Sequence, residues 1–276
     1  MNAVDENPEA DFLSGVSGTV GGLDGARREL RDRLTDAREL LGGRRARLDR
    51  AVRAGPEGRR VLALGVQRAK HADSAAAIIA ELARSRHRVQ LRFCPPGELG
   101  KFENLNRLLA REQIEECDWL LVVDDDVVLP HGFLDRLVFL AERFALDLAQ
   151  PAHRARSHAA WQATRRQAGA VAHLTRFVEI GPVTAFARST FSTLLPFPAL
   201  RMGWGLDLHW AALAREHGWR CGVLDAVAIR HLAAPVASSY SQAAAIAEAR
   251  AFLATRPYLS ASEAHATLAT YRNLRA

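Results

Sequence analysis

The pattern of apolar and polar positions divides the chain into three parts. Residues 1–20 show neither helical nor strand periodicity, and we expect them to be disordered. Residues 21–58 carry apolar positions at helical spacing and end in a glycine- and proline-rich boundary, so they predict an amphipathic helical extension. Residues 59–276 alternate short apolar runs with helical segments and form the predicted main domain.

In the extension, charged residues fill the gaps between apolar residues at nearly heptad spacing: Leu30, Leu34, Ala37, Leu41 and Leu48. Gly42-Gly43 is expected to interrupt the helix. The apolar stripe indicates a helix that packs on its own domain. Two alternatives remain open: homodimer formation through residues 23–53 as a short coiled coil, and contact with a membrane surface or another partner.

The first half of the main domain alternates predicted strands with predicted helices. The strands are 61–66, 88–93 and 119–123, and the helices are 75–83, 103–111 and 132–144. This alternation predicts parallel βαβ units and therefore an α/β fold, with a mostly parallel central sheet flanked by helices. Ligands of such sheets bind beyond the carboxyl ends of the strands, so chemistry is expected after Val66, Phe93 and Val123.

The second half is less regular. Expected strands cover 177–187 and 221–229, and expected helices cover 206–217, 240–254 and 261–273. The stretch 151–178 contains arginines and histidines but neither Asp nor Glu. It is expected to be either a mobile basic lid over an anionic ligand or a solvated basic helix.

Three consecutive carboxylates, Asp124-Asp125-Asp126, follow the apolar run at 119–123. Like charges in a row repel one another, so the cluster indicates a compensating cation. In an extended segment Asp124 and Asp126 point the same way, and hard divalent cations such as Mg²⁺ and Mn²⁺ prefer carboxylate oxygens. The alternative is a solvated turn in which one Asp caps the helix near Pro130.

Composition narrows the functional classes. The net charge of +6 is spread along the chain and fits an anionic substrate. Nothing resembles a nucleic-acid-binding motif, so no nucleic-acid partner is predicted. Three scattered cysteines indicate a reducing compartment, and the apolar stretches stop short of the ~20 residues of a transmembrane helix. We therefore expect a soluble, cytoplasmic protein without a transmembrane segment or a signal peptide.

Four landmarks together resemble the GT-A (Rossmann-like) glycosyltransferases: the Asp-x-Asp pair at 124–126, Lys101 with Asn104 and Asn106 before it, Gly203-Trp204-Gly205 after it, and the late His231. The segments Gln150-Pro151-Ala152, 177–180 (Phe-Val-Glu-Ile) and 203–207 (Gly-Trp-Gly-Leu-Asp) are similar to a group of uncharacterised plant and bacterial glycosyltransferase-like proteins. The resemblance covers residues 61–231 and leaves the extension out.

The resemblance implies a metal-dependent transferase that moves a sugar from a UDP- or GDP-sugar to an acceptor hydroxyl. It implies Mn²⁺ or Mg²⁺ held by Asp124, Asp126 and His231, with Asp207 as the general base of an inverting displacement. The expected donor-binding residues are Gln67, Lys101, Asn104, Asn106, Asp124, Asp125 and Trp204. Many relatives carry a Glu-Asp pair where this chain has Leu206-Asp207. This departure from the family pattern concerns both the assignment of Asp207 as general base and the expected inverting stereochemistry.

Three other functions stay open at this point. A haloacid-dehalogenase-like phosphatase would use Asp124 as nucleophile, but it needs a late acidic pair that the chain lacks after residue 126. A sugar-nucleotide nucleotidyltransferase would use the loop 64–70, which only faintly resembles its signature. A non-catalytic nucleotide- or sugar-binding module would need no base at Asp207.

Overall fold

The computed structural model describes residues 21–232 and 241–275. The disorder expected for residues 1–20 concerns residues outside this part. No helix of the described chain is long and apolar enough to cross a membrane.

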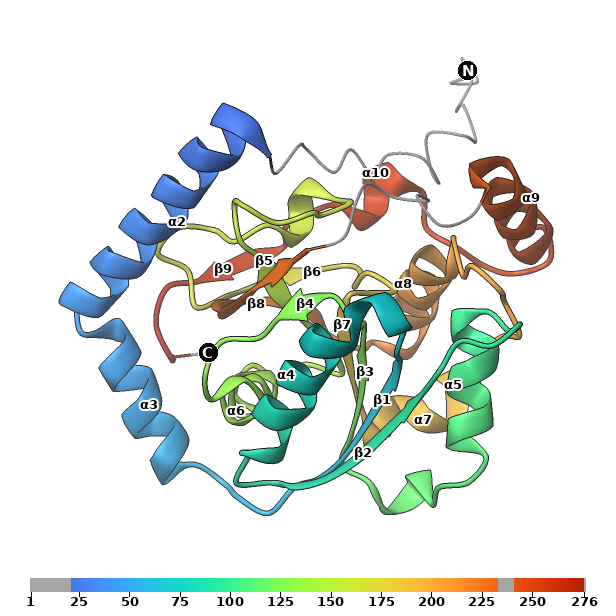
Figure 1. The fold of residues 1–276 in the computed structure, drawn as a ribbon, viewed down its shortest axis with the longest axis horizontal. Helices are drawn as coiled ribbons and strands as arrows, with labels where there is room; N and C mark the ends of the chain where they lie inside the picture. Colours follow the sequence, from blue (N-terminus) through green and yellow to red (C-terminus); the bar gives the residue numbers. More distant parts are fainter. Residues whose placement is uncertain (1–20, 233–240, 276) are drawn as a thin grey trace.

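A single central sheet runs through the main domain in the order β2-β1-β3-β7-β5-β8-β6-β9 (Figure 1). Its strands are β1 (Arg60–Val66), β2 (Arg88–Cys94), β3 (Trp119–Val123), β5 (Leu148–His153), β6 (Ala172–Thr175), β7 (Val183–Ala187), β8 (Cys221–His231) and β9 (Ala269–Tyr271). Strands β2, β1 and β3 are parallel, β5 and β8 are parallel, and β7 and β6 run the opposite way. The predicted α/β class with a mostly parallel sheet is thus confirmed.

Helices cover both faces of the sheet because its strands are apolar on both sides. On β1, Val61 and Ala63 pack with α4 (Ala72–Ala83) and α6 (Phe133–Arg143). The alternate residues Leu62 and Leu64 pack against the opposite layer. That layer contains α5 (Lys101–Leu109), α7 (Phe191–Leu194), α8 (Leu206–His217) and α9 (Gln242–Leu253).

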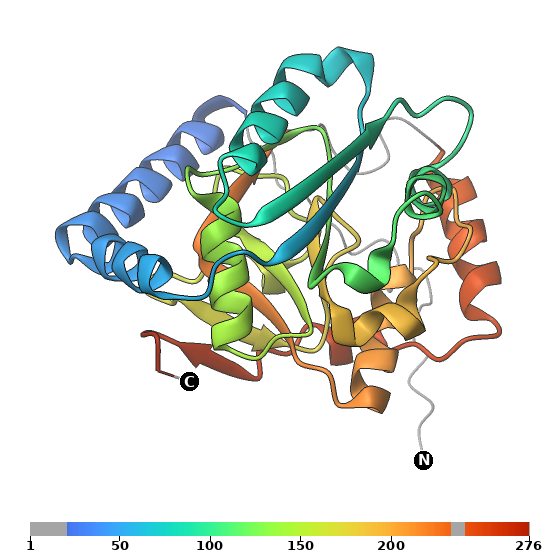
Figure 2. The ribbon, with the colours of Figure 1, turned by 90° about the horizontal axis from the view of Figure 1, so that it is seen from below.

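The extension forms two helices, α2 (Gly22–Leu41) and α3 (Arg44–Ala54), along one outer edge of the molecule (Figure 2). Gly43, with φ of 65°, separates them. Helix α3 packs on the domain through the buried side chains of Leu48 and Val52. In α2 the apolar stripe was expected to pack on the domain. That orientation is wrong, because Leu30 and Leu34 are exposed.

Two predicted elements differ from the structure. The strand expected over 177–187 is restricted to β7, because Gly181-Pro182 interrupts the run and Pro182 has no amide hydrogen to donate. The helix expected over 261–273 stops after α10 (Ala261–Ala264). Beyond it, Ala269 to Tyr271 pair with β6 as the edge strand β9, a tertiary interaction that overrides helical propensity.

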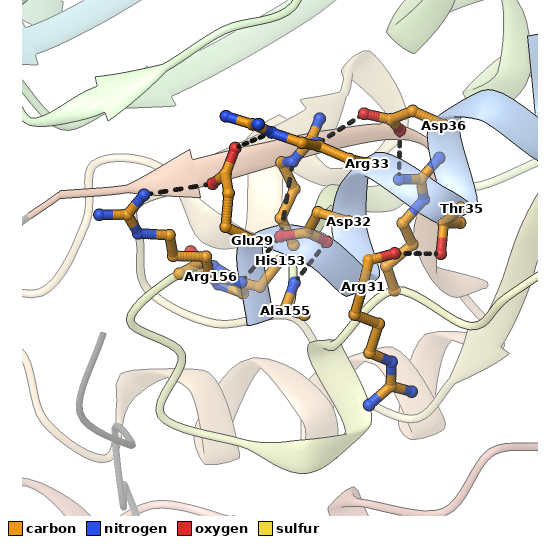
Figure 3. A network of polar contacts seen from close by, with 12 residues as sticks. Glu29, Arg31, Asp32, Arg33, Thr35, Asp36, His153, Ala155 and Arg156 are labelled. Atoms are coloured by element: carbon orange, nitrogen blue, oxygen red, sulfur yellow. Dashed lines mark hydrogen bonds and ion pairs between the residues drawn. The ribbon is translucent and has the colours of Figure 1, made fainter. Parts of the chain in front are cut away.

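The basic stretch 151–178 is not a solvated helix. Its first residues belong to β5 and its later ones to β6. Between these strands, Arg154, Arg156 and Arg166 form ion pairs with acidic side chains of α2. Figure 3 shows the contact of Arg156 with Glu29. The expected helix is therefore wrong, and these three arginines contact the extension.

Candidate active site

The aspartates follow β3 at the carboxyl edge of the sheet. Strand β1 lies beside β3 and is parallel to it, so the residues after both strands meet at the same edge. The Arg68 side chain, just beyond β1, consequently contacts both Asp125 and Asp126. This is the edge at which the sequence predicts ligand chemistry.

A short strand pairing brings His231 to the same place. After the aspartates the chain forms β4 (Val127–Val128), which pairs antiparallel with the end of β8 so that Val127 lies opposite His231. The amide of Leu232 donates to the backbone oxygen of Asp126 at 2.8 Å. This register places Nε2 of His231 3.1 Å from Oδ1 of Asp126.

Asp126 is buried, with 2% of its surface exposed. Its Oδ2 accepts a hydrogen bond from Arg68 at 2.7 Å, whereas no described group donates a well-aligned hydrogen bond to its Oδ1. Burial alone would raise the pKa of Asp126, but His231 and Arg68 outweigh burial and hold the pKa well below its usual value. Burial would lower the pKa of His231, and the Asp126 carboxylate raises it instead. Asp126 is therefore an anion whose Oδ2 is bound by Arg68 and whose Oδ1 faces only the His231 imidazole.

Asp125 points to the other side of the segment. Its carboxylate accepts hydrogen bonds from the backbone amide of Arg68 at 2.5 Å and from the Arg68 guanidinium. The hydrogen bonds to Asp125 raise the pKa of Arg68. With its carboxylate 1% exposed and bound in this way, Asp125 orients Arg68, and the donor contact expected of it has no support.

Asp124 is only partly buried and pairs with Lys101, whose Nζ lies 2.6 Å from Oδ1. The same Nζ donates to the backbone oxygen of Ile180 at 2.9 Å. Gly181 lies against this pair, so that a Cβ added there would be 2.7 Å from Oδ2 of Asp124 and 2.8 Å from Nζ of Lys101. Gly181 carries no signal in the sequence, and it must lack a side chain for the two groups to meet.

Asp124, Asp126 and His231 each offer a ligand atom, and these atoms lie within 4.8 Å of one another. They are the three ligands that the resemblance implies, and carboxylate and imidazole donors suit Mn²⁺ or Mg²⁺. Oδ1 of buried Asp126 accepts no well-aligned hydrogen bond from a described group and has only His231 beside it, which leaves it suited to a cation. A second group of the same kind, His71 with Asp125 and Asp126, is weaker because Arg68 already binds the Asp125 carboxylate.

A buried polar network supports His231 from behind. Glu179 lies 2.8 Å from Nε2 of His153, and Nδ1 of His153 lies 3.1 Å from Oγ of Ser157. That hydroxyl oxygen accepts a hydrogen bond from the backbone amide of His231 at 2.9 Å. Thr164 also donates to Glu179, at 3.0 Å. The network fixes the backbone at His231, and only Glu179 of these residues stood out in the sequence, within the Phe-Val-Glu-Ile segment.

Asp207 lies in the first turn of α8 but does not cap it. The cap position is Gly205, with φ of 82°, and Oδ1 of Asp207 accepts from the next amide, Leu208, at 3.0 Å. Burial, with a contribution from the negative charge of Glu179, raises the pKa of Asp207 to about 7. A carboxyl group of that pKa exchanges its proton near neutral pH, as a general base requires.

The remaining predicted donor contacts lie elsewhere. The Asn104 amide donates to the backbone oxygens of Pro96 and Gly100, at 2.8 and 2.9 Å. Asn106 exchanges two hydrogen bonds with the backbone of Phe197, at 2.7 and 2.9 Å. Both amides hold loops in place, so the expected donor contacts of Asn104 and Asn106 are not supported.

Trp204 is buried against helix α9, where it packs with Ala245 and Ala249. This packing does not favour the expected stacking on a sugar. Gln67 is half-buried beside Arg68, and its backbone amide donates to Cys94 at 2.8 Å. Gln67 and Lys101 therefore remain at the site edge as candidate donor contacts.

Comparisons with known proteins identify the family of the chain. The model of the family described as "Glycosyltransferase like family 2" matches residues 45–252, well over half of the chain. Among solved structures, S. aureus TarS 1-349 in complex with UDP-GlcNAc is similar, with 10% identity and a TM-score of 0.45 over 74% of this chain and 69% of that one. This structural similarity is too weak to transfer residue roles, and no curated protein matches. The chain belongs to the glycosyltransferase-like family 2, and its mixed α/β domain has the GT-A fold.

Proposed function

We propose that the protein is a metal-dependent, inverting glycosyltransferase that moves a sugar from a UDP- or GDP-sugar to an acceptor hydroxyl. The observation that carries the proposal is the convergence of Asp124, Asp126 and His231 at the carboxyl edge of the sheet, where each offers a ligand atom within 4.8 Å of the others. Family membership supports the transfer of a sugar, and the ligand set supports its dependence on a divalent cation.

Asp124, Asp126 and His231 would hold Mn²⁺ or Mg²⁺, which when bound supplies Lewis-acid stabilisation of the diphosphate leaving group. The side chains around these residues bring further positive charge to the same edge. Lys101 contacts Asp124 and Arg68 contacts Asp126, so both cations lie beside the carboxylates. In the proposal they orient the donor diphosphate and offset its charge as the sugar leaves.

Asp207 acts as the general base in this proposal. Its pKa of about 7 means that a large fraction is ionised at neutral pH, while the carboxylate remains basic enough to take a proton from a hydroxyl. Glu179 is close enough to raise the pKa of both Asp207 and His231 by its charge. Asp207 is thereby linked electrostatically to the metal-binding residues, as expected for a base that acts at the same site.

The proposal is tested by incubating the purified full chain with UDP- and GDP-sugars, with Mn²⁺ or with a chelator, and measuring release of the nucleoside diphosphate. We expect slow hydrolysis of one donor that requires the cation and is lost in Asp126→Asn. Pyrophosphate formed from a nucleoside triphosphate and a sugar phosphate would support a nucleotidyltransferase instead. Binding of a nucleotide without turnover, with any acceptor tried, would support a binding module.

A further inference from the structure

Helix α2 turns its apolar face away from the protein. At 100° per residue, one side of the helix carries leucines, alanines and arginines: Leu23, Ala26, Arg27, Leu30, Leu34, Ala37, Arg38 and Leu41. The leucines of this side are exposed, by 83% for Leu23, 58% for Leu30, 50% for Leu34 and 88% for Leu41. An apolar stripe of this length on the surface of a folded protein indicates a binding surface.

The acidic residues of α2 account for this orientation. Asp32 accepts hydrogen bonds from the backbone amides of Ala155 and Arg156, at 2.9 and 2.8 Å. Asp36 pairs with Arg154 and Arg166. Figure 3 shows the side chain of Asp32 next to Ala155. Polar contacts therefore fix the inner face of α2, and its leucines are left free to serve another purpose.

The charge of the outer face is positive. The inner acids are neutralised by arginines of the main domain, while Arg27, Arg31 and Arg38 form no ion pair with any described residue. The outer face of α2 thus combines a leucine stripe with flanking cations, and no carboxylate lies at its centre.

We propose that α2 docks in the plane of an anionic lipid bilayer. The leucine stripe enters the boundary between headgroups and acyl chains, and the flanking arginines contact lipid phosphates. From Leu23 to Leu41 the stripe is about 27 Å long, at ~1.5 Å per residue, so the whole length of the helix lies on the surface. This proposal is independent of the sugar-transfer chemistry.

A second copy of the chain is a poorer occupant for the same face. Two α2 helices packed through their leucines would bring the arginines of one copy beside those of the other, and like charges across a helical interface repel. An anionic membrane offers the opposite charge. Charge complementarity therefore favours the lipid surface over self-association.

The test is sedimentation of the full chain with phosphatidylcholine vesicles that contain phosphatidylglycerol or lack it. We expect binding only with phosphatidylglycerol, weakening as salt is raised. Leu34→Gln should weaken binding about tenfold, since one leucine no longer enters the bilayer, and Leu30→Gln/Leu34→Gln should abolish it. The matched control is Leu268→Gln, because Leu268 is exposed by 52% outside α2.

Charge is tested separately with Arg27→Gln/Arg38→Gln, which should weaken binding on the order of tenfold. Its control, Arg107→Gln/Arg111→Gln, changes two exposed arginines near the end of α5 and should bind like the unaltered protein. The altered side chains are exposed, so each variant should fold normally. Circular dichroism and the melting temperature of each variant check this. The proposal is overturned if the full chain stays unbound at millimolar lipid, or if the α2 variants bind normally. It is also overturned if the protein is a dimer that Leu30→Gln/Leu34→Gln converts to a monomer.

Discussion

Nε2 of His231 lies 3.1 Å from Oδ1 of Asp126, although the two residues come from opposite halves of the chain. The pairing of β4 with β8 produces this contact, since it sets Val127 opposite His231. The imidazole and the buried carboxylate lie beside a partly buried Asp124. We propose that a divalent cation is bound by all three residues, because two carboxylates and an imidazole within 4.8 Å of one another form a suitable ligand set.

The two candidate metal groups share Asp126 but differ in their histidine, so the histidines distinguish them. His231→Gln should weaken Mn²⁺ binding by about tenfold or more, because it removes one ligand of the preferred group. His71→Gln is the matched change in the other group and should have little effect. Titration calorimetry with Mn²⁺ on both variants measures the difference. A larger loss of Mn²⁺ affinity in His71→Gln would mean that the metal is bound by the group His71, Asp125 and Asp126 instead.

Asp207→Asn should leave donor binding unchanged and reduce sugar transfer by about 10²–10⁴, because the amide cannot accept the acceptor proton. The pKa of Asp207, about 7, sets the pH dependence of the unaltered enzyme. Below this pKa the carboxyl is protonated and cannot act as base, so the rate should rise through pH 7 and then level off. Initial rates from pH 5 to 9 test this, and normal transfer by the variant would exclude Asp207 as base.

The same residue predicts a change of stability with pH. Between the ordinary pKa of 3.8 and the folded-state value of about 7, the unfolded chain loses the Asp207 proton while the folded protein keeps it. Folding therefore becomes less favourable as pH rises through this window, and the full cost is present above pH 7. Asp207→Asn removes the charge, so it should stabilise the protein by roughly 2–4 kcal/mol at pH 8 and by much less at pH 4. Urea unfolding at both pH values measures this, and equal effects at both would contradict it.

Gly181→Ala should impair the site without unfolding the protein. The new Cβ would be 2.7 Å from Oδ2 of Asp124 and 2.8 Å from Nζ of Lys101, so the ion pair must separate. We expect donor binding to weaken about tenfold, because Asp124 and Lys101 are displaced from the positions in which they would bind the metal and the donor. Gly21→Ala, whose Cβ would meet nothing within 4 Å, is the control. Donor affinities measured by fluorescence or calorimetry should differ between the two variants, and equal affinities would mean that the close approach at Gly181 is irrelevant.

The sequence is informative where local pattern and position in the sheet agree. The apolar run of β3 predicts a buried strand, and three carboxylates at its end are costly without a partner. Family order points to His231, and the structure brings it beside Asp126. The two aspartates of the candidate metal site therefore follow from local features of the sequence, a strand end and a cluster of charge, whereas His231 follows from the family resemblance.

Tertiary contacts decide what the sequence does not predict. Arg68 binds Asp125 because β1 and β3 are neighbours, which no spacing along the chain reveals. Glu179, between β6 and β7, meets His153 at the end of β5. Helix α2 turns its leucines outward because its acids bind arginines of the segment that follows β5. In each case a polar partner distant in sequence outweighs the local pattern.

The central claim is that Asp126 holds a divalent cation on which nucleotide binding depends, and calorimetry tests it most directly. A UDP or GDP titration into the full chain, with and without Mn²⁺, is compared for the unaltered protein, Asp126→Asn and Asp118→Asn. Asp118 is a half-buried Asp that precedes the opposite end of β3 and pairs with Arg188. We predict that one nucleotide binds at least about tenfold more tightly with Mn²⁺, that Asp126→Asn loses this gain, and that Asp118→Asn keeps it. Nucleotide binding that is equally tight without the cation, or unchanged in Asp126→Asn, would contradict the account.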